Sequence, residues 1–162
     1  MARALIVGCG CSGRDLAARL RERGWRVRGT SRSREGAEGI EAAGVESAVA
    51  DPDRPGTVLD LVGDVAVVVW LLGSAEGDPG TVAAIHGPRL ERLLERLVDT
   101  PVRGVVYEAA GAVDPAALDR GAEAVSRAER TWRLPAAILR AERSDRRWGD
   151  DAVAAVEGVL PG

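Results

Sequence analysis

Residues 3–30 read RALIVGCGCSGRDLAARLRERGWRVRGT, and this stretch decides the fold that we expect. The apolar run 3–8 ends in glycine, which is typical of a strand buried on both faces of a parallel sheet. A helix is predicted over 14–23, because apolar residues recur there at helical spacing and Gly24 follows at the position of a C-terminal cap. Residues 25–30 predict a second strand.

The rest of the chain repeats this alternation. Further strands are predicted at 45–50, 65–71, 102–107 and 136–140, and helices at 34–43, 57–62, 88–98, 115–133 and 151–160. Crossovers between parallel strands are right-handed and helices must cover both faces of the sheet. We therefore expect one doubly wound α/β (Rossmann) domain over residues 1–162, with about six strands in the order 3-2-1-4-5-6. Segments 73–80 and 143–150 are predicted as loops at the carboxyl edge, where ligands bind in such folds.

The composition excludes several classes of protein. All 22 Lys and Arg positions are arginine, so mechanisms that need a lysine are excluded. The net charge is −3 and the arginines are interspersed with acids, which argues against a nucleic-acid partner. No apolar run approaches the length of a bilayer span, and the first residues do not resemble a leader, so we expect a cytoplasmic protein. With only Cys9, Cys11 and one histidine, a metal site is not expected.

The segment GCGCSG, residues 8–13, has the pattern G-x-G-x-x-G between a predicted strand and a predicted helix. In a dinucleotide site Gly8 permits the tight turn, Gly10 lets the backbone approach a diphosphate, and Gly13 allows the helix to pack closely on the strand. The amides that open the helix, from Cys11 and Ser12 to Arg14, then meet the phosphates. The alternative is a tight turn without a ligand.

The end of the second predicted strand lacks the acid that usually binds the ribose of NAD. Thr30, Ser31 and Arg32 stand there, with Arg34 close behind, and their donors suit the additional 2′-phosphate of NADP. NADP is therefore the preferred cofactor. Asp51, after the third strand, is predicted either to meet the adenine ring or to cap the next helix.

These residues resemble the short-chain dehydrogenase/reductase superfamily, in its atypical or extended epimerase-like branch. The resemblance spans most of the chain. It rests on the glycine loop, on RGTSR at 28–32, on Ala50-Asp51 and on Leu71-Leu72-Gly73, and it implies that Asp51, Leu72 and Gly73 contact the cofactor.

The resemblance fails at the catalytic residues. Catalytic members use a Ser or Thr after the fifth strand and a Tyr-x-x-x-Lys pair, whereas Ala109 and Ala110 follow the strand here and no lysine exists. Tyr107, the only tyrosine, is predicted to be a core residue. The resemblance also implies a C-terminal substrate region, and this sequence ends soon after the sixth predicted strand. We therefore expect a shallow pocket, or one shared with a partner subunit in a homo-oligomer.

Three other residue types are functional candidates. His86 is predicted to be a loop histidine, with an acid or base as the alternative. The thiols of Cys9 and Cys11 are either small packing residues or groups whose pKa is lowered by the nearby helix start. Trp70 and Trp148 either stack on a ligand ring or pack in the core.

Two functions remain open, and no catalytic residue is assigned in either. The first is an NADPH-dependent reductase that lacks the standard triad, in which water or Glu108 handles protons and the unknown small-molecule substrate is oriented against the cofactor. The second is a non-catalytic module that senses NADP and regulates a protein partner.

Overall fold

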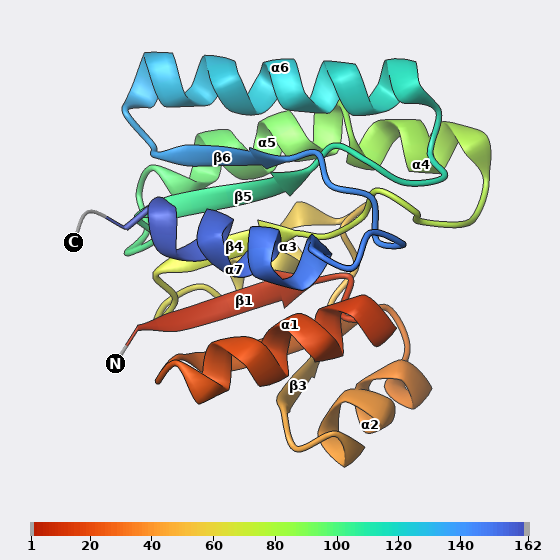
Figure 1. The fold of residues 1–162 in the computed structure, drawn as a ribbon. Coiled ribbons are helices and arrows are strands. Elements are labelled where there is room, and N and C mark those ends of the chain that lie inside the picture. Colours follow the sequence, from red (N-terminus) through yellow and green to blue (C-terminus); the bar gives the residue numbers. More distant parts are fainter. Residues whose placement is uncertain (1, 161–162) are drawn as a thin grey trace.

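The computed structural model describes residues 2–160, and their strands form one parallel sheet in the order β3-β2-β1-β4-β5-β6 (Figure 1). This confirms the predicted doubly wound topology. The strands are β1 (Arg3–Val7), β2 (Arg26–Ser31), β3 (Glu46–Val49), β4 (Val67–Trp70), β5 (Gly104–Glu108) and β6 (Ala136–Leu139). The chain order reverses direction between β1 and β4, which is where ligands bind in open α/β sheets.

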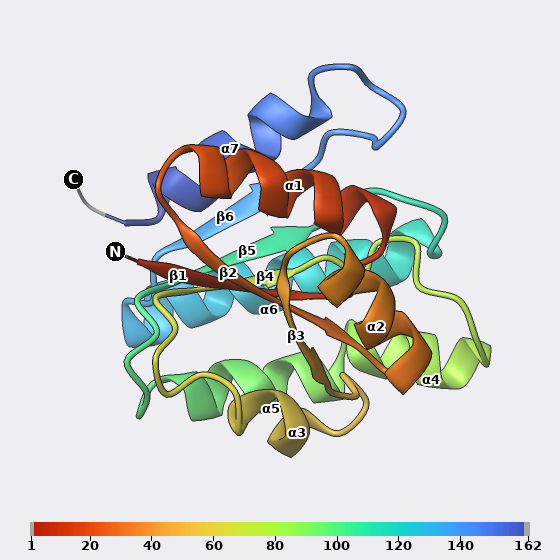
Figure 2. The ribbon, with the colours of Figure 1, turned by 90° about the horizontal axis from the view of Figure 1, so that it is seen from below.

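Helices cover both faces of the sheet. They are α1 (Cys11–Glu22), α2 (Arg34–Ala42), α3 (Pro55–Leu59), α4 (Pro79–Ile85), α5 (Pro88–Leu97), α6 (Pro115–Trp132) and α7 (Trp148–Gly158). Helices α1, α2 and α7 lie on one face and α3 to α6 on the other, so that the molecule has three layers (Figure 2).

Each layer of helices has its own hydrophobic core against the sheet. The four leucines of α5, at positions 90, 93, 94 and 97, are at most 1% exposed and pack against β4 and β5. The spacing of these leucines in the sequence predicts this stripe, and replacing one of them by alanine would cost about 2–5 kcal/mol. Apart from Arg3, the central strands β1 and β4 are apolar, because both of their faces are covered.

The structure departs from the sequence prediction mainly near the carboxyl edge. Helix α1 begins at Cys11 rather than at residue 14, α7 begins at Trp148 rather than at 151, and α3 lies two to three residues earlier than predicted. Helix α4 was missed altogether. Its seven residues are too few to display a helical period, and a glycine-rich segment precedes them.

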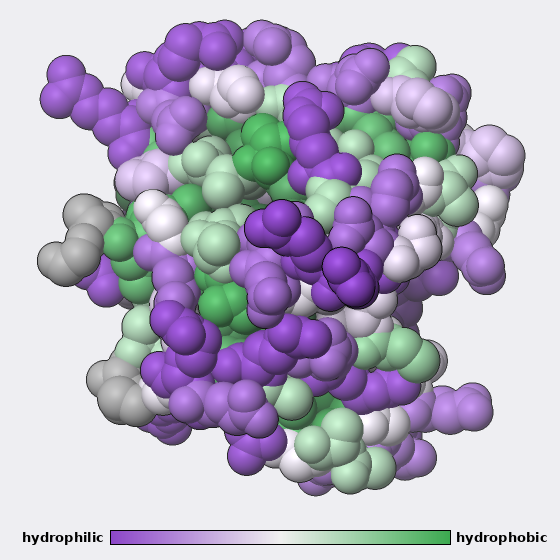
Figure 3. All heavy atoms as spheres, viewed as in Figure 1, coloured by the Kyte–Doolittle hydropathy of each residue, from purple (hydrophilic) through white to green (hydrophobic). Residues whose placement is uncertain are grey.

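The surface agrees with the charged composition. One face is predominantly hydrophilic, with hydrophobic residues confined to small patches between the helices (Figure 3). None of the helices over residues 2–160 combines the length and the hydrophobicity that a membrane span requires.

Candidate functional site

The glycine loop lies at the carboxyl end of β1, and each of its three glycines meets a different requirement. Gly8 has φ +88°, and a Cβ there would lie 2.6 Å from the carbonyl oxygen of Leu71. A Cβ on Gly13 would lie 3.1 Å from the sulfur of Cys9, so this glycine allows α1 to sit close to the loop. A Cβ on Gly10 would meet nothing within 4 Å, and Gly10 lines a pocket. Gly10 therefore leaves room for a ligand.

Helix α1 starts without a side-chain cap, because its N-cap is Gly10. The first intrahelical bond runs from the amide of Arg14 to the carbonyl of Gly10, at 2.8 Å. The first amides of a helix have no partner within it, so the N–H groups of Cys11, Ser12 and Gly13 are left for another acceptor. An anion at this place would accept them and would also be favoured by the helix dipole.

The two cysteines of the loop differ in environment. Cys9 is buried, and its burial raises the pKa of its thiol to about 11 although the charge of Arg14 acts in the opposite direction. The hypothesis of a lowered thiol pKa is therefore wrong for Cys9. Its side chain fills the space that the missing Cβ of Gly29 leaves on β2. Cys11 is exposed, and its sulfur accepts a hydrogen bond from Arg14 at 3.3 Å.

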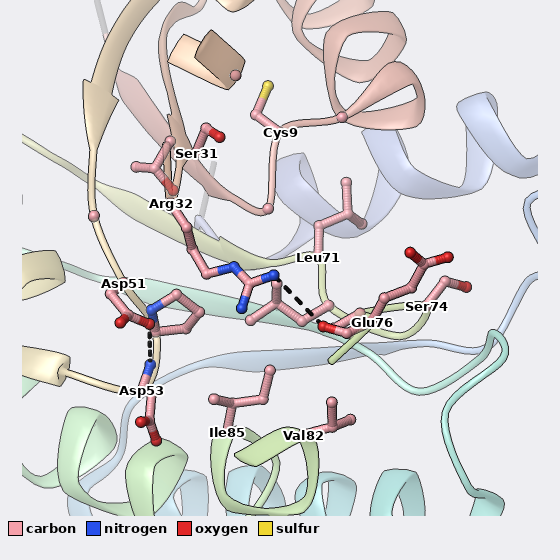
Figure 4. Close-up of a pocket in the computed structure, with 18 of the residues that line it drawn as sticks. Cys9, Ser31, Arg32, Asp51, Asp53, Leu71, Ser74, Glu76, Val82 and Ile85 are labelled. Carbon is pink, nitrogen blue, oxygen red and sulfur yellow. Dashed lines mark hydrogen bonds between the residues drawn. The ribbon is translucent and has the colours of Figure 1, made fainter. Parts of the chain in front are cut away.

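A pocket of about 310 Å³ lies beside this loop, at the edge where β1, β2 and β4 end (Figure 4). Eight of the residues expected to bind a cofactor line it: Gly8, Gly10, Arg14, Thr30, Ser31, Arg32, Asp51 and Leu72. The side chains of Cys11 and Ser12, together with Gly13 and Gly73, are not among its lining residues. Leu71, Val82 and Ile85 form an apolar part of the wall, and the last two come from the unpredicted helix α4.

The end of β2 brings Arg32 over the pocket. Thr30 is 1% exposed, Ser31 is partly buried, and Arg32 is exposed. The guanidinium of Arg32 reaches across the pocket to the carbonyl oxygen of Glu76, at 3.5 Å (Figure 4). No carboxylate is paired with Arg32 among the described residues, so its charge remains free for an anionic ligand.

Asp51 does not cap a helix. Helix α3 has Arg54 as its N-cap, without a side-chain hydrogen bond. Oδ1 of Asp51 instead accepts from the amide of Asp53 at 2.9 Å, while the amide of Asp51 donates to the hydroxyl of Thr57 at 2.8 Å. This turn holds Asp51 on the pocket wall, so the capping alternative is wrong.

A buried ion pair joins the ends of β4 and β5 to the segment after β6. Glu108 is 0% exposed, and Arg143 donates to both of its oxygens, from Nε to Oε2 at 2.9 Å and from Nη2 to Oε1 at 2.8 Å. The amide of Gly73 donates to Oε1 at 2.8 Å, and Arg143 also donates to the carbonyl of Leu71 at 3.2 Å. Glu108 is thus fully engaged and does not line the pocket, so the interpretation of Glu108 as a proton carrier is wrong.

Arg143 lines the pocket, but the sequence did not identify it as a site residue. An acid at the end of an apolar, buried strand is a signal that a cation must be near, because a buried carboxylate is rarely left unpaired. The sequence offers Arg140, Arg143, Arg146 and Arg147 close together, and nothing in it distinguishes them.

His86 lies in the turn between α4 and α5, as predicted, but its side chain is buried. It is 0% exposed, with Nε2 2.9 Å from the carbonyl oxygen of Leu72 and Nδ1 2.6 Å from the hydroxyl of Tyr107. A carbonyl only accepts, so Nε2 carries the proton and the Tyr107 hydroxyl donates to Nδ1 of the neutral ring. Burial lowers the pKa of His86 and raises that of Tyr107. Tyr107 is confirmed as a core residue, and His86 supports the pocket from behind Leu72.

Both tryptophans near the edge are packing residues. Trp70 is 0% exposed and its indole N–H donates to the carbonyl of Ile85 at 3.1 Å. Trp148 is 3% exposed, within the core beneath α1 and α7. The alternative in which they stack on a ligand is therefore wrong. Within residues 2–160 no three His, Cys, Asp or Glu side chains are grouped closely enough to hold a metal ion.

The sheet order and the glycine loop at its switch point define the chain as a Rossmann-type α/β domain. Its structure is similar to a short-chain dehydrogenase/reductase superfamily protein from Agrobacterium tumefaciens with bound NAD (TM-score 0.70, 22% identity, covering 85% of this chain and 48% of that one). It is also similar to the UDP-glucuronic acid 4-epimerase of Bacillus cereus in complex with NAD (TM-score 0.69, 16% identity, 85% and 55%). A third is the UDP-glucose 4-epimerase of Thermotoga maritima with UDP-glucose (TM-score 0.70, 14% identity, 85% and 54%).

These likenesses establish the fold and confirm the structural resemblance to short-chain dehydrogenases and epimerases. The chain spans about half the length of the structures that it matches. No protein-family model matches the sequence, and no curated protein matches it.

Proposed function

We propose that this chain binds a dinucleotide of the NAD(P) type, with its diphosphate against the amides that open α1. The observation that carries the proposal is the open space at Gly10, the one loop glycine whose missing Cβ faces the pocket rather than the protein. The pocket volume of about 310 Å³ falls at the lower end of the range for small-molecule sites. The bound NAD of the A. tumefaciens and B. cereus structures supports the same class of ligand.

We further propose that NADP is preferred over NAD. Two observations at the end of β2 support this preference. Ser31 and Arg32 stand where NAD-binding domains usually have an acid, and the guanidinium of Arg32 has as its partner only the carbonyl oxygen of Glu76, at 3.5 Å. A 2′-phosphate is a dianion that pairs well with a guanidinium, whereas a ribose hydroxyl gains little from it. Arg32 would exchange the weak contact with Glu76 for the phosphate.

The dinucleotide, when bound, would supply a hydride to a carbonyl, quinone or flavin acceptor. The residues of the pocket would orient it: Leu71 and Leu72 flank the end of β4, and Val82 and Ile85 exclude water on the side of α4. Reductase activity by this route would rely on water for the proton, because the hydroxyl of Tyr107 is buried against His86.

The second candidate is an NADP sensor without catalysis. It is favoured because the two side chains that could transfer a proton already have partners within the protein. Glu108 forms an ion pair with Arg143, and the hydroxyl of Tyr107 is hydrogen-bonded to His86. A reductase should oxidise NADPH when such an acceptor is added. A sensor should bind NADP and NADPH with unequal affinity and show no turnover with any acceptor.

Binding is tested by calorimetric titration of NADPH into the protein and into Gly10→Val. The valine would occupy the space that the diphosphate needs, and we expect loss of at least about 100-fold in affinity. Gly63→Val is the matched control, because a Cβ there also meets nothing within 4 Å but lies away from the pocket. Unchanged affinity in Gly10→Val, or no binding to the parent protein, would refute the proposal.

The cofactor preference is tested separately with Arg32→Ala. A charge-assisted hydrogen bond is worth about 1.5–3 kcal/mol, so the dissociation constant for NADPH should rise about tenfold to a hundredfold while that for NADH stays within about twofold. Arg26→Ala, an exposed arginine at the opposite end of β2, is the control. Equal losses for both cofactors would remove the assignment of the phosphate to Arg32.

A further inference from the structure

A second concave surface lies between α3 and α5. It is a groove of about 540 Å³, which we call the arginine groove, and its lining shares no residue with the dinucleotide pocket. Its lining residues are Arg54, Pro55, Gly56, Leu59, Pro88, Arg89, Arg92 and Arg96. Four arginines and no acid line it.

The sequence of α5 concentrates this charge on one side of the helix. Arg89, Arg92 and Arg96 are spaced i, i+3 and i+7, so they project from one face. Glu91 lies on another face and is paired with Arg127 of α6, at 3.8 Å. Glu95 is not among the lining residues of the groove. The arginines of α5 that line the groove therefore lie on a different side of the helix from Glu91, and neither Glu91 nor Glu95 forms an ion pair with them.

Most of these arginines have no counter-charge in the protein. Arg89 donates from Nε to Asp53 at 3.1 Å, whereas Arg54, Arg92 and Arg96 make no ion pair within the part of the chain that the structure describes. Arg92 and Arg96 are four residues apart, a spacing at which like charges on a helix repel. The repulsion would be relieved by an anion placed between them.

We propose that the arginine groove binds a small polyvalent oxyanion, a molecule with at least two phosphate or carboxylate groups. Guanidinium groups present planar pairs of N–H donors that match both kinds of group, and several guanidiniums around one concavity favour a multiply charged ligand over a monovalent one. The volume of the groove lies within the usual range for small-molecule sites. The other lining residues are Pro55, Gly56, Leu59 and Pro88, and none of them has a polar side chain that would compete with the arginines.

The experiment is a calorimetric titration of pyrophosphate and of citrate, at about 20 mM salt so that the charges are not screened. It is done in the Gly10→Val protein, which keeps the anions out of the phosphate loop. The test variant adds Arg92→Gln and Arg96→Gln. The control adds Arg21→Gln and Arg103→Gln, which remove the same charge from exposed arginines that have no ion pair among residues 2–160.

We expect at least one of the two anions to bind with one-to-one stoichiometry, and the stronger of them identifies the acid group that the groove prefers. The test variant should bind at least about tenfold more weakly, and the control within about twofold of its parent. If the test variant does not fold, Arg54→Gln, which changes the groove from the α3 side without touching α5, should give the same direction of effect. No binding of either anion, or equal losses in test and control variants, would overturn the proposal.

Discussion

Removing the arginine that neutralises a fully buried carboxylate should destabilise this protein more than any exposed substitution. Glu108 is 0% exposed and accepts three hydrogen bonds, two from Arg143 and one from the amide of Gly73. In Arg143→Met the carboxylate would keep only the bond from Gly73 and would have no cation. Breaking a buried pair from one side costs about 3–5 kcal/mol. Because the side chain of Arg143 is 29% exposed, we expect the lower end, about 3 kcal/mol.

The paired variant separates the cost of the orphaned charge from the value of the ion pair. In Glu108→Gln with Arg143→Met the new amide oxygen can still accept from Gly73, and no charge is left in the interior. We therefore expect the double variant to be more stable than Arg143→Met alone, with a loss of about 1 kcal/mol relative to the parent.

The assay is urea unfolding at neutral pH, with the slope m checked for constancy among the variants. For a chain of 162 residues, about 3 kcal/mol corresponds to a fall in Tm of about 6–12 °C. A loss below about 1 kcal/mol for Arg143→Met, or a double variant less stable than the single one, would refute the account of a buried, neutralised carboxylate.

Two further predictions concern the buried His86 and the two cysteines. Burial lowers the pKa of His86 below its ordinary value of 6.5, so the unfolded chain binds the proton more readily than the folded protein does. The free energy of unfolding should therefore be greatest above about pH 7 and should fall as the pH is lowered. In His86→Gln, the midpoint of urea unfolding should decline less steeply with falling pH. An equally steep decline in the variant would exclude His86 as its source. Iodoacetamide at about pH 8 should alkylate the exposed Cys11 and spare the buried Cys9, because burial raises the thiol pKa of Cys9 to about 11. Peptide mass spectrometry identifies the alkylated residue. Alkylation of both cysteines in the native protein would contradict this prediction.

The sequence determined the architecture because the relevant signals are local. The apolar run of β1, the glycines at 8, 10 and 13 and the leucine stripe of α5 each express their structure within a few residues. The strand order follows from this alternation through the right-handed crossover rule. The sequence by itself also shows that its 162 residues include no lysine and that Ala109 and Ala110 follow β5.

Only the tertiary structure decided which side chains complete the site. Arg143 meets Glu108 across 35 residues, and His86 meets Tyr107 across 21, so neither pairing leaves a periodic signal in the chain. Helix α4 supplies three residues of the pocket wall, Thr81, Val82 and Ile85, but is too short to be recognised from its sequence. Burial, which sets the thiol pKa of Cys9 and the neutral state of His86, depends on all the layers that pack around a group, and the neighbouring residues in the sequence do not specify it.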